Sequence, residues 1–168
     1  MKDDPIFRAR ASVSTPLQSQ TNSPRRILVV EDDPYICHLS AEVLIQHGFE
    51  VNAAEDGAAG WEELQAHNYN LLITEQDLPK LTGVKLVKKL RAARMALPVV
   101  LVAEKLPAPE VARSPSLQIA ATLVKPFAVD ALVNTVETIL RATDSPREQI
   151  EPSANRRGPP SDRGLRLR

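Results

Sequence analysis

Short apolar runs alternate with segments of helical periodicity between residues 26 and 142. Five such runs occur, at 27–30, 49–54, the start of 71–79, 98–103 and 119–124. Continuous apolar runs of this length are typical of strands in a parallel sheet that is covered on both faces. The pattern therefore predicts an α/β domain in which five strands alternate with helices.

Capping residues mark where the predicted helices begin and end. Asp33 and Pro34 supply an N-cap and a proline at the first helical position, and Gly48 ends the same helix. We expect Asp33 to act only as a cap. Asp56-Gly57 and Thr82-Gly83 open the next two helices.

Helical spacing assigns the inward face of each helix. The predicted inward side chains are Ile36, Leu39, Val43, Leu44, Trp61, Leu64, Val84, Val87, Leu90, Leu132, Val133, Val136, Ile139 and Leu140. Lys85, Lys88 and Lys89 take the exposed face of the third helix. The fourth crossover, 104–118, contains three prolines, so its helix should be short, because a proline in a helix interior costs about 3 kcal/mol.

Right-handed crossovers and short connections favour a flavodoxin-like strand order, 2-1-3-4-5, with helices on both faces. This order places strands one and three side by side. In such sheets, ligands bind outside the carboxyl ends of the strands, where the strand order reverses. Functional side chains are therefore expected at the ends of the runs.

The chain outside this pattern differs in composition. Residues 1–25 mix Ser, Thr, Gln, Pro and Arg, and residues 143–168 contain four prolines and six arginines. Neither segment can bury enough apolar surface to offset the entropy lost on ordering. We predict disordered tails on either side of a single domain at 26–142.

Charge and cysteine content exclude several classes of protein. Residues 26–142 hold 11 Lys and Arg against 15 Asp and Glu, and this acidic balance argues against nucleic-acid binding. The single cysteine, Cys37, rules out an internal disulfide and a Cys-based zinc site. The sequence shows no membrane span and no signal-peptide apolar region. We expect a cytoplasmic protein that is a monomer or a weak dimer.

Charged residues follow three of the apolar runs directly. The first run ends in three acids at 31–33, the third delivers Glu75 and Asp77, and the fifth ends at Lys125. The predicted strand order brings these ends to one edge of the sheet. Several acids facing one lysine favour a metal or ion-pair site over solvated surface charges.

Three motifs together resemble the receiver domain of bacterial two-component response regulators, over about residues 26–141. They are Val29-Val30-Glu31-Asp32-Asp33-Pro34, Leu78-Pro79-x-x-Thr82-Gly83 and Val124-Lys125-Pro126-Phe127. The resemblance implies that Glu31 and Asp32 help to hold Mg²⁺, with the backbone carbonyl of Asp77. It implies that Lys125 grips a phosphoryl group, and that the partner is a sensor histidine kinase or a downstream signalling protein.

Three positions depart from the family pattern. Glu75 stands where the family has the aspartate that accepts phosphate, Ala103 replaces the Thr or Ser that ends strand four, and Thr122 replaces an aromatic switch residue. Glutamate is one methylene longer than aspartate, and a misplacement of about 1 Å can cost roughly 100-fold in phosphoryl transfer. We expect Glu75 to stay ionised beside Lys125 and to hold the domain in one signalling state.

Magnesium binding should survive but be weak. Glu31, Asp32 and Glu75 supply hard oxygen ligands, but the longer Glu75 side chain disturbs the octahedral geometry that Mg²⁺ requires. Lys125 also competes for the same carboxylates.

The sequence thus predicts a stand-alone receiver that acts in a phosphorelay by protein–protein interaction, is not an enzyme, and is atypical in being independent of phosphorylation. The alternative is a small Mg²⁺-dependent phosphatase or another enzyme on a similar sheet. Such an enzyme would need Asp-x-Asp after strand one, or a phosphate loop of the Gly-x-x-x-x-Gly-Lys-Ser/Thr type. Neither pattern occurs.

Overall fold

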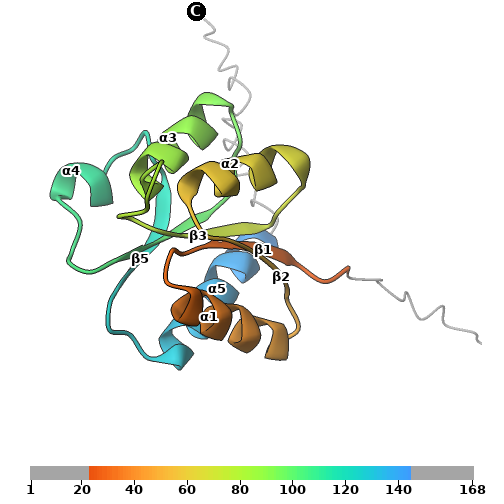
Figure 1. Ribbon diagram of the computed structural model, residues 1–168. Helices are drawn as coiled ribbons and strands as arrows, with labels where there is room; N and C mark the ends of the chain where they lie inside the picture. The colour runs from red at the N-terminus through yellow and green to blue at the C-terminus, as the bar shows by residue number, and fades with distance from the viewer. Residues whose placement is uncertain (1–22, 145–168) are drawn as a thin grey trace, which may run out of the picture.

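A five-stranded parallel sheet runs through the domain, with helices packed on both faces (Figure 1). The computed structural model describes residues 23–144, so the predicted disorder of the tails concerns residues that lie almost wholly outside this range. The strands are β1 (Arg26–Val30), β2 (Glu50–Ala54), β3 (Leu71–Glu75), β4 (Val99–Ala103) and β5 (Ile119–Val124). Their order, β2-β1-β3-β4-β5, confirms the predicted flavodoxin-like topology.

The helices fill the crossovers between the strands. They are α1 (Pro34–Gln46), α2 (Gly57–Ala66), α3 (Gly83–Ala92), α4 (Pro109–Ala112) and α5 (Val129–Asp144). Helices α1 and α5 cover one face of the sheet, and α2, α3 and α4 lie on the other (Figure 1). The fourth helix is only four residues long, as the prolines of its crossover predict.

The predicted caps form. The Asp33 carboxylate accepts hydrogen bonds from the backbone N–H groups of Tyr35 and Ile36, which confirms its role as the N-cap of α1. Asp56 and Thr82 cap α2 and α3 in the same way. Gly48 follows the last turn of α1 at a φ of +86°, a backbone conformation that glycine adopts without strain.

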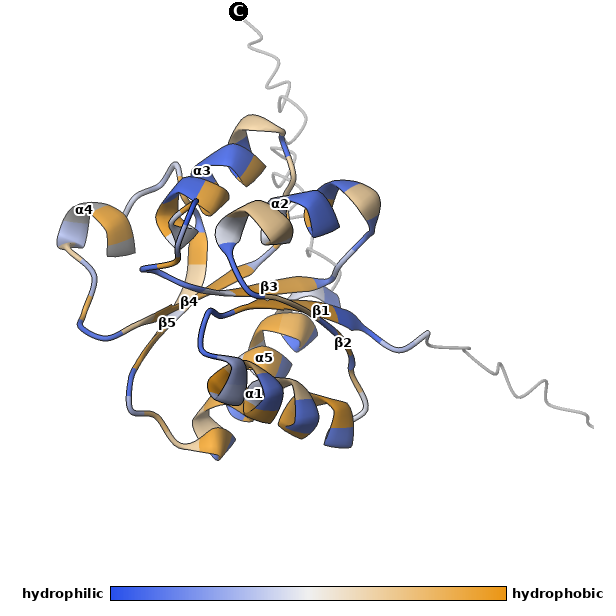
Figure 2. Ribbon diagram, viewed as in Figure 1, coloured by the Kyte–Doolittle hydropathy of each residue, from blue (hydrophilic) through white to orange (hydrophobic). Residues whose placement is uncertain are grey.

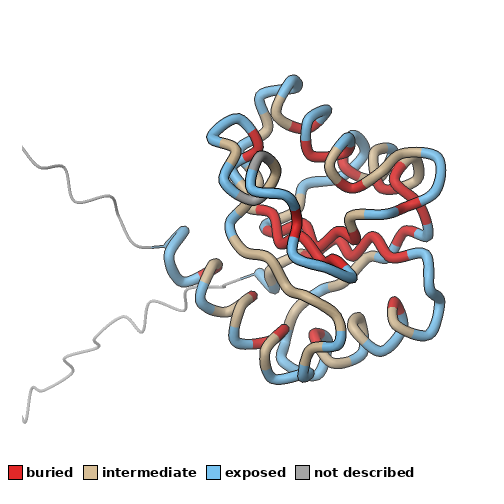
Figure 3. Tube along the Cα trace, turned by 90° about the vertical axis from the view of Figure 1, so that its left-hand side faces the viewer, coloured by how far each residue is buried: buried red, intermediate tan, exposed pale blue. Residues whose placement is uncertain are grey.

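Two apolar clusters form the core, one on each side of the sheet. The strands are hydrophobic along most of their length, and buried residues concentrate in the strands and on the inward sides of the helices (Figures 2 and 3). The cluster under α1 and α5 comprises Ile27, Val29, Cys37, Leu44, Leu71, Ile73, Val100, Val102, Leu132, Val136 and Leu140. The cluster under α2 and α3 comprises Leu28, Val30, Ala54, Leu64, Leu72, Leu78, Leu86, Val87, Leu90, Val99 and Leu117.

Three details differ from the sequence prediction. Leu39 was predicted to face inward but is 40% exposed, because it lines a surface groove beside α5. Trp61 is only partly buried, and Lys89 Nζ lies 4.7 Å from the centre of its ring. The last helix continues past residue 142, the predicted end of the domain, to Asp144, whose carboxylate forms an ion pair with Arg25.

None of the helices within residues 23–144 is long and apolar enough to cross a membrane.

Candidate functional site

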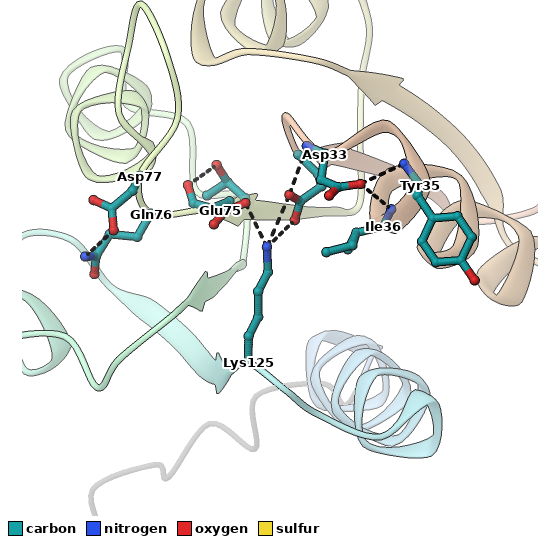
Figure 4. Close-up of polar contacts among 9 residues, drawn as sticks. Asp33, Tyr35, Ile36, Glu75, Gln76, Asp77 and Lys125 are labelled. Atoms are coloured by element: carbon teal, nitrogen blue, oxygen red, sulfur yellow. Dashed lines mark hydrogen bonds and ion pairs between the residues drawn. The ribbon is translucent and has the colours of Figure 1, made fainter.

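Charged side chains from three strand ends meet at the carboxyl edge of the sheet. Val30 of β1 pairs with Thr74 of β3, so the next residues, Glu31 and Glu75, emerge side by side. The side chain of Lys125 points from the end of β5 toward Glu75 (Figure 4) and also contacts Glu31. Its Nζ atom lies 2.9 Å from Glu75 Oε2 and 3.0 Å from Glu31 Oε2.

The backbone fixes the positions of these residues. The N–H of Glu31 donates to the carbonyl of Ala54 at 3.1 Å, and the N–H of Lys125 donates to the carbonyl of Ala103 at 2.9 Å. Sheet hydrogen bonding therefore continues one residue beyond β1 and β5. The start of α1 also contacts the site, because the N–H of Asp33 lies 3.3 Å from Glu31 Oε1.

The site is buried. Glu31 and Glu75 are 5% and 6% exposed, and the side chain of Lys125 is 13% exposed. A buried charge is costly unless it is paired, and here two carboxylates share a single ammonium group. Glu31, Glu75 and Lys125 are therefore not solvated surface charges but a buried ion-pair cluster, and the predicted metal site stays a prediction.

Burial and the second carboxylate shift the pKa values of the cluster. Burial raises the pKa of Glu75, and the neighbouring Glu31 raises it further, while Lys125 acts in the opposite direction without compensating. Burial lowers the pKa of Lys125, but its hydrogen bonds to Glu75 and Glu31 outweigh this, and the net shift is upward. The expectation that Glu75 stays ionised rested on its contact with Lys125, and burial adds an opposing influence on its pKa.

The remaining predicted site residues lie around this cluster. Asp32 is exposed and contributes one oxygen to the group of acids. The side chain of Asp77 is exposed, and one of its oxygens lies 3.4 Å from Gln76 Nε2, on the side away from Lys125 (Figure 4). Ala103 is 1% exposed at the end of β4, and Thr122 is partly buried in β5.

Gly83 has a role at the site that the sequence analysis missed. A Cβ atom at this position would lie 1.9 Å from the carbonyl oxygen of Glu75, so only glycine allows α3 to begin so close to the acceptor position. The backbone N–H of Gly83 also donates to the carbonyl of Gln76 at 2.9 Å. The Thr-Gly motif was interpreted as a helix cap, and nothing in the local sequence indicated the contact with β3.

The three acids fit a hard divalent cation in their chemistry. Glu31, Asp32 and Glu75 each offer an oxygen, and these atoms lie within 4.8 Å of one another. An octahedral Mg²⁺ holds its ligand oxygens at about 2.1 Å, which places neighbouring ligands about 3 Å apart and opposite ligands about 4.2 Å apart. Lys125 contacts two of the three acids and would compete with a metal ion for their carboxylates.

The response regulator receiver domain family matches residues 27–137, and the chain therefore belongs to this family. The chemotaxis protein CheY1 of Helicobacter pylori is 30% identical over 123 residues, which cover 71% of this chain and 99% of CheY1. The transcriptional regulatory protein RprY of Bacteroides fragilis is 28% identical, over 69% of this chain and 49% of RprY. The chain thus spans about half the length of some of the relatives that it matches.

Solved structures show the same architecture. The response regulator TrrA of Thermotoga maritima, solved in complex with Mg²⁺-BeF, is 27% identical with a TM-score of 0.61, over 68% of this chain and 98% of TrrA. A CheY-like receiver domain protein from Methanospirillum hungatei has a TM-score of 0.67 over 71% of this chain and 96% of its own; at 24% identity it supports the fold alone.

Proposed function

We propose that this receiver domain signals without phosphorylation at its acceptor position. The observation that carries the proposal is the contact between Glu75 Oε2 and Lys125 Nζ at 2.9 Å. A carboxylate thereby occupies the side of Lys125 on which a phosphoryl group would lie. The buried Ala103 has no hydroxyl group that could donate a hydrogen bond to a phosphoryl group at this position.

We also propose that Mg²⁺ binds weakly to the acidic cluster of this site. Glu31, Asp32 and Glu75 would hold it, together with the backbone carbonyl of Asp77, and it would supply positive charge to this acidic cluster. TrrA, which was solved with Mg²⁺-BeF, supports this assignment by its likeness. Competition from Lys125 is the reason for the low affinity that we propose.

Signal output is proposed to occur through protein–protein contacts in the cytoplasm, with a histidine kinase or a downstream protein of a two-component system as the partner. A groove of about 420 Å³ borders Lys125, between α1 and the start of α5. Partly exposed apolar side chains, including Leu39 and Val129, line it, and surfaces of this kind often mark protein contacts. The stand-alone organisation and the monomeric or weakly dimeric state stay predictions.

Phosphorylation with a small donor tests the proposal. We expect the wild-type protein, incubated with acetyl phosphate and Mg²⁺, to keep its intact mass, whereas the Glu75→Asp variant gains one phosphoryl group. The reason is that the shorter side chain withdraws the carboxylate from Lys125 and leaves room for in-line transfer. A phosphorylated wild-type protein would contradict the proposal. An unmodified Glu75→Asp variant would show that the pocket as a whole, and not Glu75 alone, prevents transfer.

A further inference from the structure

The loop between β3 and α3, residues 76–82, determines the geometry of one side of the site. It begins directly after Glu75 and carries Asp77, whose carbonyl is assigned to the metal. The first residue is fixed by a 2.7 Å hydrogen bond from the N–H of Gln76 to the carbonyl of Val102. The end is fixed by the bond from Gly83 to Gln76 described above.

The middle of this loop contains a tight turn. The N–H of Leu81 donates to the carbonyl of Pro79 at 2.6 Å, so the chain reverses around Lys80. Lys80 has a φ of +60°, in the left-handed region that residues other than glycine rarely adopt. Such a conformation persists only when the surrounding structure holds it in place.

Asp56 holds this turn from the neighbouring helix. Its Oδ2 atom lies 2.6 Å from Lys80 Nζ, while Oδ1 accepts 2.8 Å hydrogen bonds from the N–H groups of Ala58 and Ala59. Asp56 is 3% exposed, and its bonds to the first turn of α2 fix its position. The hydrogen bond from Lys80 is the main cause of the lowered pKa of Asp56, so the carboxylate is charged at neutral pH.

The backbone makes a second contact at the same place. A Cβ atom on Gly57 would lie 1.8 Å from the carbonyl oxygen of Leu81, so the first residue of α2 lies directly against the loop. The ion pair and this close approach involve consecutive residues, 56 and 57 on one side and 80 and 81 on the other. The loop and the start of α2 are therefore joined at two adjacent points.

We propose that Asp56 and Lys80 are positioning residues of the site, because their ion pair ties the β3–α3 loop to the start of α2 and keeps the carbonyl of Asp77 in place. The part of this inference that concerns the metal rests on the proposed function; the part that concerns the loop does not. The first turn of α2, which contributes no ligand, then affects metal affinity through Lys80.

Charge-neutral and charge-conserving variants test the proposal in the full-length protein. Lys80→Gln removes the positive charge, whereas Lys80→Arg keeps it. Asp56→Asn removes the negative charge of the ion pair, and asparagine is still a good N-cap residue for α2. Lys88→Gln, at an exposed lysine of α3, is the matched control. The two measurements are amide hydrogen exchange of Asp77, Leu78, Lys80 and Leu81 by NMR and the dissociation constant of Mg²⁺ by calorimetry.

We expect Lys80→Gln and Asp56→Asn each to speed exchange in the loop and to weaken Mg²⁺ binding roughly threefold. The double variant should be no worse than either single one, because both remove the same interaction. Lys80→Arg should restore wild-type behaviour, and Lys88→Gln should not differ from it. Unchanged loop exchange in Lys80→Gln, or additive effects in the double variant, would overturn the proposal. If the wild-type protein binds no Mg²⁺, the metal assignment of the proposed function fails, and the exchange data alone decide whether the ion pair holds the loop.

Discussion

At the scale of single residues, Lys125 controls the charge balance of the site. Replacing it with methionine would leave Glu31 and Glu75, both buried, without a positive partner among residues 23–144. Removing one member of a buried ion pair costs about 3 kcal/mol, so we expect the free energy of unfolding of Lys125→Met to fall by that amount. Mg²⁺ should bind this variant more tightly than the wild type and restore part of its stability, because the competing ammonium group is gone.

Urea unfolding with and without Mg²⁺, and a calorimetric titration, measure these two effects. Lys85→Met, at an exposed lysine of α3, is the control for the loss of a positive charge and should change neither quantity appreciably. An unchanged Mg²⁺ affinity in Lys125→Met would mean that the ammonium group and the metal do not compete.

Ala103 limits what a restored aspartate can achieve. We expect Glu75→Asp to accept phosphate or beryllofluoride with little further conformational change, because position 103 offers no hydroxyl group to the ligand. Glu75→Asp combined with Ala103→Thr should show larger and more widespread amide NMR shifts on addition of beryllofluoride and Mg²⁺. Equal shifts in the single and double variants would show that Ala103 is not what limits switching.

Site residues that follow from the strand order could be predicted from the sequence. Contacts between residues on different segments could not. Glu31, Glu75 and Lys125 were expected together because each follows an apolar run, and the carboxyl ends of parallel strands share one edge. The contact of Gly83 with β3 and the ion pair of Asp56 with Lys80 join segments whose distance in space cannot be predicted from local sequence patterns. The direction of the pKa shift of Glu75 depends on its burial, which likewise became visible only in the structure.

At the scale of elements, Arg91 joins α3 to the segments that lead into β4 and β5. Its guanidinium group donates to the carbonyls of Met95 at 2.7 Å, Leu97 at 2.9 Å and Leu117 at 2.9 Å. Replacing it with methionine would leave these partly buried acceptors without their donor. We expect the free energy of unfolding to fall by about 2–3 kcal/mol in a urea titration.

Lysine at position 91 separates the effect of charge from the effect of geometry. It keeps the positive charge but cannot match the fork of donors, so Arg91→Lys should recover only part of the lost stability. Lys88→Met, on the exposed face of the same helix, should unfold like the wild type. A fully stable Arg91→Met variant would show that these carbonyls find other donors.

The helices and strands themselves were largely predictable, because apolar runs and capping residues are local signals. The three predicted N-caps form as expected: Asp33 caps α1, Asp56 caps α2 and Thr82 caps α3. Leu39 was misassigned because helical spacing identifies an apolar face but not whether another element covers all of it. The domain was predicted to end at residue 142 because composition changes there, whereas α5 continues to Asp144, which contacts Arg25, 119 residues earlier in the chain.

At the scale of the whole molecule, that contact bears on where the folded unit ends. The carbonyl of Arg25 accepts a 2.9 Å hydrogen bond from the N–H of Glu50, and its side chain pairs with Asp144. Arg25 thereby extends the pairing of β1 with β2 by one residue and connects it to the last turn of α5. Residues 23–144 should accordingly be a more stable unit than 26–142, the range that composition alone predicts.

Limited proteolysis and thermal unfolding test this boundary. Proteolysis of the full chain should leave one resistant core that retains both Arg25 and Asp144. A protein trimmed to residues 26–142 should melt roughly 2–4 °C below one trimmed to 23–144, because it lacks the ion pair and the additional sheet hydrogen bond. Arg25→Gln in the longer protein removes the charge but keeps the backbone bond, and should lower the melting temperature by only part of this difference. Equal melting temperatures for the two trimmed proteins would place the boundary where composition puts it and would leave the contact between Arg25 and Asp144 without a measurable role.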